Sequence, residues 1–335
     1  MPSALTALTA VTAEAAGGRG GGLTVNWTIE GDDVSVEVAV GPDPGSIDRS
    51  GAVTTDPATR SIHLVELPPG RPYVAVTPVG GGKTLYAAPR RVDLEGPVNF
   101  RDLGGLPTTG GRHTRWGLVF RSDALSRLTA RDQLLFGQMG IRTVFDLRGE
   151  EERERSPNPF RGAEVTTRTY PLIGSRSRSF ASVAGTLDAG EDFLFDLYRH
   201  MASDSALLLG SILNDLSDPD ALPAVFHCAG GKDRTGLTAA LLLTLLDVPL
   251  GHVLDDYVLT SAFLSQDRLD DLVRRVAGEG ISPEAAAGLF GVPRWAMERT
   301  LAEVVDRHGS IETYLAEAGG MQPEAFDRLR RNLLV

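Results

Sequence analysis

The sequence predicts an α/β protein in which a mostly parallel sheet, flanked by helices, is preceded by a small all-β sandwich. Two observations predict this. Between residues 23 and 92, short segments alternate polar and apolar residues and are separated by glycine- and proline-rich turns. From residue 94 onward, short apolar segments alternate with segments of helical period. We therefore divide the chain into 1–22, 23–92 and 93–335.

The first two parts differ in composition. Residues 1–22 are rich in small side chains and end in Gly-Gly-Arg-Gly-Gly-Gly, so we expect a flexible tail. Residues 23–29 and 34–40 alternate with period two, and further strands are expected at 61–67 and 72–79. Short strands with regular turns and no helical period are typical of a β-sandwich.

The third part carries strands and helices in turn. Strands are expected at 118–121, 142–147 and 224–227, and helices at 129–139 and 235–246. The stretch 250–335 is expected to be nearly all helical, with helices at 264–276 and 295–305. Residues 149–189 are polar. In them we interpret the charge run 150–155 as a solvated helix start or loop, and the arginines of 174–179 as part of either a substrate-facing or a disordered segment.

Composition excludes several classes of function. The 335-residue chain has a formal net charge of -11 and a pI of about 5.1, which disfavours generic binding to nucleic acid or to anionic membranes. No apolar run approaches the roughly 18 residues of a membrane span. A single cysteine rules out an intramolecular disulfide and a cysteine-only zinc site. Because no secretory signal is evident and a lone thiol suits a reducing compartment, we expect a cytoplasmic location, with export by another route as the alternative.

The strongest chemical signal is the segment His227-Cys-Ala-Gly-Gly-Lys-Asp-Arg-Thr-Gly236, between an expected strand and an expected helix. Five residues separate Cys228 from Arg234. In a tight glycine-rich loop, backbone N–H groups point inward and form an anion site, and the following helix adds its partial positive charge. That field favours the nucleophilic thiolate of Cys228. A lone cysteine is often only a small core residue, but this combination of spacing and flanking elements indicates phosphate chemistry.

Other residues of the loop have expected roles that follow from their chemistry. Gly230 and Gly231 let the backbone approach a phosphate without a side-chain clash. Arg234 can bind two phosphate oxygens with its planar guanidinium and offset charge in the transition state. Thr235 can donate a hydrogen bond to the sulfur when it leaves phosphorus.

The sequence leaves open the roles of three other residues of the segment, His227, Lys232 and Asp233. His227 either hydrogen-bonds the loop or only ends the strand. Lys232 can contact additional phosphate groups, and Lys83 is the only other lysine among 33 lysine and arginine residues, so we interpret position 232 as one that requires a compact ammonium. Asp233 is either a general acid that protonates the leaving oxygen or a structural anchor of the loop.

This loop resembles that of the atypical bacterial tyrosine phosphatases, which carry an H-C-x-x-G-K-D-R-T motif. Within about residues 94–335, further segments agree with that family in the same order: Asn99 to Gly105, Arg121 to Asp123, Gly140 to Arg148, Asp256-Tyr257, Gly309-Ser310 and Tyr314-Leu315. In the first part, Trp27 and the segment from Leu67 to Tyr73 resemble fibronectin type III domains. The resemblance implies a cysteine-phosphatase-like catalytic unit with an added fibronectin type III-like sandwich.

The family resemblance also implies the roles of individual residues. Cys228 is the nucleophile and Arg234 the phosphate clamp, and the phosphate site is lined by Cys228, Ala229, Gly230, Gly231, Lys232, Asp233 and Arg234. His227 and Thr235 support the loop, and hydrogen bonds from a further group are expected to do the same: Asn99, Arg101 and Asp102. No metal or other cofactor is expected.

The identity of the acid stays open between two aspartates. The chain has no Trp-Pro-Asp segment, so the acid of the conventional tyrosine phosphatases has no counterpart. Asp233 lies in the loop. Asp146 is the second candidate, because carboxylates at strand ends face the ligand crevice of open α/β sheets. The alternatives for Asp146 are an ion pair with Arg148 or a helix cap.

We expect a phosphomonoester hydrolase that forms a phosphocysteine and acts on phosphotyrosine proteins, with scope for broader specificity. Members of the family act on phosphotyrosine, and some also on phosphoserine, phosphothreonine and phosphoinositides. A phosphoinositide phosphatase is one alternative, which Lys232 favours and the acidic net charge opposes. A non-catalytic phosphate-binding module is another, which the intact Cys228, Arg234 and Asp233 oppose. The sandwich either recruits a protein partner, positions the catalytic unit, or only stabilises it.

Overall fold

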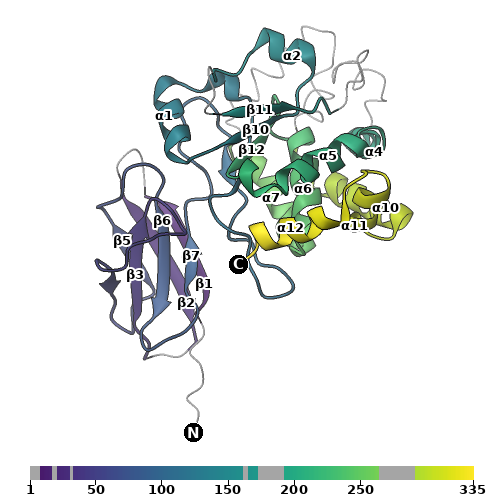
Figure 1. The fold of residues 1–335 in the computed structure, drawn as a ribbon. Helices are drawn as coiled ribbons and strands as arrows, with labels where there is room; N and C mark the ends of the chain where they lie inside the picture. The colour runs from purple at the N-terminus through teal and green to yellow at the C-terminus, as the bar shows by residue number, and fades with distance from the viewer. Residues whose placement is uncertain (1–7, 17–20, 31–32, 161–164, 173–191, 264–290) are drawn as a thin grey trace.

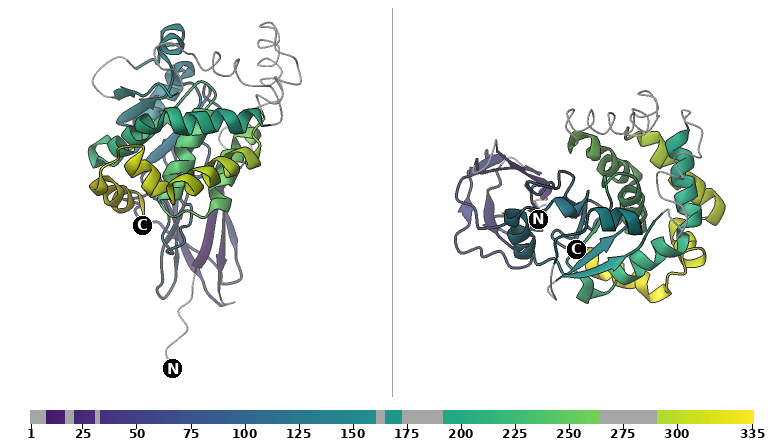
Figure 2. Two further views of the ribbon diagram at one scale, coloured as in Figure 1. Left: turned by 90° about the vertical axis from the view of Figure 1, so that its right-hand side faces the viewer. Right: turned by 90° about the horizontal axis from the view of Figure 1, so that it is seen from above.

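The computed structural model describes residues 8–16, 21–30, 33–160, 165–172, 192–263 and 291–335. The chain forms a β-sandwich and a larger α/β unit, which lie side by side (Figures 1 and 2). The helix expected at 264–276 and the segment 174–179 lie outside the described residues. Within the part of the chain that the structure describes, no helix has both the length and the apolar character needed to cross a bilayer.

Antiparallel strands build the sandwich in two sheets. One sheet contains, in order, β1 (Leu8–Ala15), β2 (Leu23–Ile29) and β5 (Ser61–Leu64). The other contains, in order, β4 (Val53–Thr54), β3 (Val36–Gly41), β6 (Tyr73–Pro78) and β7 (Leu85–Ala87). Alternate residues of β2 are buried, as the period of two predicts, and they pack with inward residues of β3 and β6 in one apolar cluster.

One part of the expected tail is instead a strand. β1 pairs antiparallel with β2, and Val11 lies opposite Trp27. Leu8 and Ala13 of β1 are buried in the sandwich core. The expectation of a flexible tail is therefore corrected for residues 8–15. Threonine and valine favour a strand, but small side chains at most positions of LTAVTAEA hid the alternation.

A third sheet, of five strands, forms the centre of the larger unit. It contains, in order, β11 (Thr166–Thr169), β10 (Thr143–Asp146), β12 (Ala224–His227), β9 (Val119–Ser122) and β8 (Arg101–Asp102). All neighbouring pairs are parallel except β8 with β9, which confirms the predicted mostly parallel sheet. The register places Asp146 beside His227, so the segments that follow β10 and β12 meet at one edge of the sheet.

Helices cover both faces of this sheet. Val144 and Val225 pack on one face with Phe136 of α1 (Ala130–Gln138). Phe145 and Phe226 pack on the other face, in the large apolar cluster. That face carries α4 (Phe193–Asp204), α5 (Ala206–Leu216), α6 (Asp233–Leu245), α7 (Leu250–Phe263), α10 (Arg294–His308), α11 (Ile311–Glu317) and α12 (Pro323–Leu333) (Figure 1). Short helical segments complete the unit: α2 (Glu150–Arg155) and 3-10 turns at Leu125–Arg127 and Pro219–Ala221.

Local sequence explains where two of these helices begin. At α1, the Thr129 hydroxyl accepts from the Asp132 N–H, and the Asp132 carboxylate accepts from the Thr129 N–H, which is a capping box. At α6, the chain passes from the glycines of the cysteine loop directly into the helix, and the leucine-rich body is buried almost throughout. Strand β12, the loop and α6 therefore form one rigid unit in the core.

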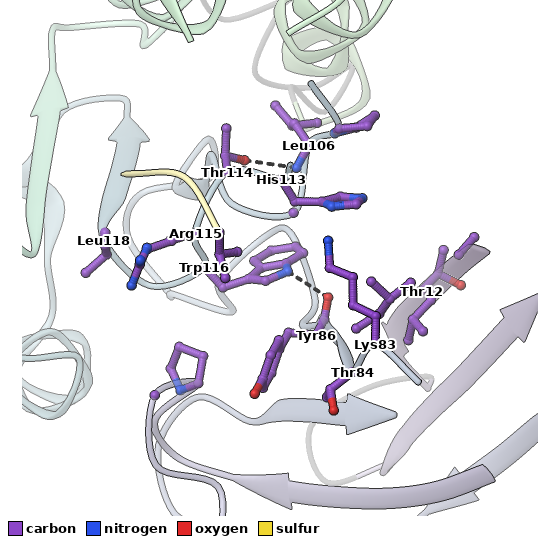
Figure 3. Close-up of a pocket in the computed structure, with 18 of the residues that line it drawn as sticks. Thr12, Lys83, Thr84, Tyr86, Leu106, His113, Thr114, Arg115, Trp116 and Leu118 are labelled. Atoms are coloured by element: carbon purple, nitrogen blue, oxygen red, sulfur yellow. Dashed lines mark hydrogen bonds between the residues drawn. The ribbon is translucent and has the colours of Figure 1, made fainter. Parts of the chain in front are cut away.

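The sandwich and the larger unit meet around Trp116. Its indole Nε1 donates a hydrogen bond to the carbonyl of Tyr86 in β7, at 2.9 Å. Beside this contact lies a cavity of about 650 Å³, whose lining includes Lys83 and Tyr86 of the sandwich and Leu106, His113 and Trp116 of the larger unit (Figure 3). The contact between the two units therefore contains open space as well as direct contacts.

Candidate active site

The cysteine loop lies at the carboxyl edge of the central sheet. β12 ends at His227, the loop occupies 228–232, and α6 begins at Asp233. The side chain of Cys228 is buried, and the Gly231 N–H donates to its sulfur at 3.2 Å. Ala229 and Gly230 are exposed, so the outer side of the loop faces solvent. The sulfur thus lies under an open loop, close to the positive end of a helix.

The conformation of the loop requires glycine at position 231. Gly231 has a φ of +66°, and a Cβ built there would lie 2.6 Å from the backbone nitrogen of Asp123. Side chains rarely adopt this backbone conformation, and here the space for one is also missing. Any substitution of Gly231 would therefore displace the N–H group that contacts the sulfur.

Arg234 is buried on the first turn of α6 and holds a carboxylate. Its Nη1 and Nη2 donate to Oε2 and Oε1 of Glu152 at 2.6 and 2.9 Å. Burial lowers the pKa of the guanidinium, but the Cys228 sulfur and the Glu152 carboxylate raise it more, so the net pKa lies above the ordinary value. The cation beside the sulfur is thus held charged and in a fixed orientation.

Sequence reasoning missed Glu152. We interpreted the run 150–155 as solvated, yet Glu152 occupies the third position of α2 and bonds both Arg234 and the Gly149 N–H. Its partner Arg234 lies 82 positions further along the chain, so no local pattern indicates the pair. The available signal was the position of Glu152 just after β10, whose carboxyl end faces the same edge as the loop.

Replacing Glu152 with glutamine is expected to lower kcat/KM by about tenfold to a hundredfold, because a charge-assisted bidentate contact with Arg234 is lost. Steady-state kinetics on a phosphotyrosine peptide measure the effect. Glu151→Gln is the matched control, since the Glu151 side chain is 73% exposed and pairs with Arg155 on the surface. Equal kinetics for the two variants would show that Glu152 does not orient Arg234.

The carboxylate of Asp146 is held by Arg148. Nε and Nη2 of Arg148 donate to its two oxygens at 2.8 and 2.7 Å, and Nε2 of His227 lies 3.5 Å away. Burial raises the pKa of Asp146, but Arg148 and His227 lower it more, and the net pKa falls well below the ordinary value. Of the interpretations offered from sequence, this geometry matches the ion pair with Arg148.

His227 bridges that ion pair and the loop. Its Nδ1 lies 3.2 Å from the carbonyl oxygen of Cys228, within hydrogen-bond distance. On the other side, Asn158 lies 3.1 Å from Nε2 and donates to Asp146 at 3.2 Å. Asn158 was not identified from sequence, because it lies in the irregular segment after α2. This arrangement matches the supporting role considered for His227.

Asp233 and Lys232 lie together where the loop enters α6. The Tyr198 hydroxyl donates to the Asp233 carboxylate at 2.6 Å, and the Lys232 ammonium lies 3.3 Å from it. Lys232 also donates to the carbonyl of Gly291 at 2.9 Å. Burial and the Asp233 carboxylate raise the pKa of Tyr198 well above its ordinary value, so the hydroxyl stays protonated. Asp233 is therefore oriented by Tyr198 of α4 as well as by Lys232 of the loop.

Asn99 and Arg121 bind the backbone of the cysteine loop through hydrogen bonds. Asn99 Nδ2 and Arg121 Nη2 donate to the carbonyl of Gly231 at 3.0 and 2.9 Å. Arg101 donates to the side chain of Asn99, and both arginines pair with the buried carboxylate of Asp256. Burial and the neighbouring Arg121 lower the pKa of Arg101 to about 10, which leaves it charged at neutral pH.

Asp102 does not join this group, although sequence reasoning placed it there with Asn99 and Arg101. As the next residue in a strand, it points to the opposite side from Arg101. It pairs instead with Arg71 of the sandwich. Thr235 does lie beside the loop: its hydroxyl oxygen is buried and has no hydrogen-bond partner among the described residues.

A cysteine loop between a parallel strand and a helix, with an arginine on the first helical turn, defines the class of cysteine-dependent phosphatases. The chain belongs to the tyrosine phosphatase family, because residues 92–335 match the model of that family. The protein is thus a protein tyrosine phosphatase, a phosphoric monoester hydrolase.

Named relatives share much of the chain. A protein of Cupriavidus necator that carries the name tyrosine-protein phosphatase is 29% identical over 227 residues, which cover 66% of this chain and 81% of that protein. The triple specificity protein phosphatase PtpB of Mycobacterium tuberculosis is 26% identical over 279 residues, which cover 72% of this chain and 98% of that protein. The crystal structure of P. aeruginosa TpbA is 18% identical, with a TM-score of 0.29, and covers 56% of this chain and 90% of that chain.

Proposed function

We propose that the protein hydrolyses phosphotyrosine in proteins through a phosphocysteine at Cys228. The proposal rests mainly on the position of the Cys228 sulfur. It contacts the Gly231 N–H within the loop, just before α6, whose first turn carries Arg234. These groups stabilise negative charge on the sulfur and on a phosphate bound above it.

The first step transfers the phosphoryl group to the enzyme. The Cys228 thiolate attacks phosphorus, the S–P bond forms, and the bond to the tyrosine oxygen breaks. Arg234 and the N–H groups of the loop bind the non-bridging oxygens, whose charge they offset in the transition state. Asp233 gives its proton to the departing oxygen.

The second step returns the enzyme to its starting state. Water attacks the phosphocysteine, and the Asp233 carboxylate takes the proton of that water. The S–P bond breaks, and the sulfur leaves as a thiolate. The buried Thr235 hydroxyl, which has no hydrogen-bond partner among the described residues, would donate a hydrogen bond to this leaving sulfur. Inorganic phosphate then departs through the open side of the loop.

We assign the acid to Asp233 and not to Asp146. A general acid must alternate between protonated and ionised forms within reach of the leaving oxygen. Asp233 directly follows the loop as the first residue of α6, and its side chain is 15% exposed. Asp146 is held ionised in its contact with Arg148, and its side chain is only 2% exposed. A proton on Asp146 would also cost that buried ion pair.

Replacing Asp233 with asparagine is expected to slow hydrolysis of a phosphotyrosine peptide by about 10²- to 10³-fold. Hydrolysis of p-nitrophenyl phosphate should slow much less, because p-nitrophenolate leaves without a proton. Comparison of kcat/KM on the two substrates measures this dependence on the leaving group. Asp146→Asn is the companion variant. The assignment fails if Asp146→Asn shows the dependence and Asp233→Asn does not.

A phosphoinositide substrate is the second candidate. The buried ammonium of Lys232 at the start of α6 favours it, because inositol lipids carry further phosphates. A relative named for triple specificity also supports a broad substrate range. The formal net charge of -11 opposes an anionic membrane as the working surface.

Kinetics on matched substrates test the proposal. A phosphotyrosine peptide, the same peptide with phosphoserine, and a soluble phosphoinositide would be compared in the presence of a metal chelator. The proposal predicts the highest kcat/KM for phosphotyrosine. Comparable turnover of the phosphoinositide would favour the lipid candidate. Turnover of none of them would favour a module that binds phosphorylated partners without hydrolysis.

We also assign the N-terminal sandwich to the fibronectin type III type. Its two antiparallel sheets support this, as do Trp27 on the early strand β2 and Tyr73 at the start of β6 after a Pro-Pro-Gly turn. A reducing compartment such as the cytoplasm suits an enzyme whose single cysteine must remain a thiol.

A further inference from the structure

Strand β8 connects two buried polar groups that face in opposite directions. It consists of Arg101 and Asp102, and successive side chains of a strand point to opposite faces. Arg101 contacts Asn99 and Asp256, which belong to the group that holds the cysteine loop. Asp102 contacts Arg71 of the sandwich. The side chains of Arg101 and Asp102 are fully buried. A single peptide unit therefore joins the support of the phosphate loop to the N-terminal domain.

On the sandwich side, Asp102 is bound by Arg71, which lies in the turn before β6. Nη1 of Arg71 donates to Oδ2 of Asp102 and, at 2.6 Å, to the hydroxyl of Tyr73. Nη2 donates to the carbonyl of Pro89 at 2.9 Å, and the guanidinium packs 4.6 Å from the centre of the Tyr73 ring. Arg71 is 5% exposed. We refer to the contact between Arg71 and Asp102 as the junction ion pair.

The junction ion pair is buried on both sides. Burial lowers the pKa of Arg71, but Asp102 and Tyr73 together raise it more, and the net pKa lies above the ordinary value. Asp102 also accepts from the N–H groups of Gly104 and Gly117, both at 2.8 Å. Loss of Arg71 would remove the guanidinium that contacts this buried carboxylate, which is costly. The backbone around Asp102 would then shift to expose or re-pair it.

On the catalytic side, two sets of contacts would transmit a shift of β8 to the cysteine loop. Arg101 donates to the side chain of Asn99, which donates to the carbonyl of Gly231. Arg101 also pairs with Asp256, which holds Arg121, and Arg121 donates to the same carbonyl. Gly231 is the residue whose N–H contacts the Cys228 sulfur.

Apolar packing does not replace the junction ion pair as the link between the two units. Among the described residues, the apolar cluster of the sandwich ends at Ala87 and shares no member with the two clusters of the catalytic unit. A cavity of about 650 Å³ occupies part of the contact, beside Trp116 (Figure 3). The sandwich part therefore meets β8 through polar contacts. Arg71 binds the side chain of Asp102, and the backbone of residues 90–92 bridges β8 at Arg101. Arg90 also donates to the carbonyl of Asp102, and the Trp116 hydrogen bond lies beside them.

We propose that Arg71 is a positioning residue for catalysis. Arg71 holds β8 in place from the sandwich, and β8 in turn fixes the orientation of Gly231 in the cysteine loop through Asn99 and Arg101. The N-terminal domain is then a working part of the enzyme and not only an appendage. This inference rests on the proposed function of the cysteine loop.

The test compares Arg71→Met with Arg49→Met, a matched change at an exposed arginine of the same sandwich that bonds Thr84. Kinetics use p-nitrophenyl phosphate, which is too small to touch the sandwich from the site. Iodoacetamide alkylation of Cys228 as a function of pH reports the thiolate without turnover. Thermal unfolding confirms that each variant is folded. Arg71→Gln, which keeps hydrogen-bond donors but removes the charge opposite Asp102, serves if Arg71→Met does not fold.

We expect Arg71→Met to lower kcat by about tenfold with a small change in KM, and to shift the alkylation profile to higher pH. Arg49→Met should match the wild type in both. A folded Arg71→Met, or Arg71→Gln in its place, with wild-type kcat and wild-type alkylation overturns the inference. Cys228→Ser separates the two proposals. If it retains turnover, the proposed function fails. If it is inactive while both Arg71 variants behave as wild type, only this inference fails.

Discussion

Replacing Cys228 with serine is expected to lower kcat on a phosphotyrosine peptide by at least about 10⁴-fold, because a serine hydroxyl is hardly ionised at neutral pH and the nucleophile is lost. The change removes little volume from a buried position, so the fold should persist. Steady-state kinetics with a sensitive phosphate assay measure the loss. The N–H groups of the loop and Arg234 remain, so binding of the phosphopeptide should persist as well.

The control for this variant is its binding, measured by calorimetry with the phosphopeptide and with the same peptide lacking phosphate. If the variant binds the phosphopeptide but not the unphosphorylated peptide, the site is intact and only the nucleophilic step has been removed. Residual turnover within tenfold of the wild type would exclude Cys228 as the nucleophile.

The second large effect is expected for Arg234→Lys, which should lower kcat/KM by about 10³-fold or more. Lysine keeps the positive charge but cannot bind two phosphate oxygens in a planar fork. It also loses the two-point contact with Glu152, so the cation is no longer held in orientation. Values of kcat and KM on the phosphotyrosine peptide show whether binding, chemistry or both are affected.

Arg330→Lys is the matched control, because Arg330 pairs with Glu312 far from the loop. It should behave as the wild type. If Arg234→Lys lost less than tenfold, charge alone would be sufficient at this position. The bidentate role of Arg234 would then be wrong.

The sequence predicted the parts of the fold and of the site that lie close together along the chain. The cysteine loop is one continuous segment, and its glycines, flanking strand and flanking helix are all visible there. The period of two gave β2 and β3, where apolar side chains alternate with polar ones. It did not give β1, in which small residues weaken the alternation.

Contacts between segments that are distant along the chain could not be predicted from the sequence. Glu152 meets Arg234, and Asn158 meets His227, only because the carboxyl ends of β10 and β12 lie side by side. The pattern of charges around Glu152 is the same as that of a solvated helix. Only the spatial neighbour distinguishes the two cases.

Asp102 shows a related limit. The resemblance grouped it with Arg101, and the structure separates them, because adjacent residues in a strand face opposite sides. The partner of Asp102, Arg71, lies in a proline-rich turn of another domain, where nothing in the sequence indicates a role. The division of the chain into domains thus hid a contact that crosses the boundary.

The central claim, a phosphocysteine at Cys228, is tested most directly by trapping the intermediate. Enzyme and phosphotyrosine peptide would be mixed rapidly, quenched in acid within the first turnover, and digested for peptide mass spectrometry. We expect a phosphate adduct on the peptide that contains Cys228, and no adduct in Cys228→Ser. Release of tyrosine peptide without any adduct, or with the adduct on another residue, would contradict it.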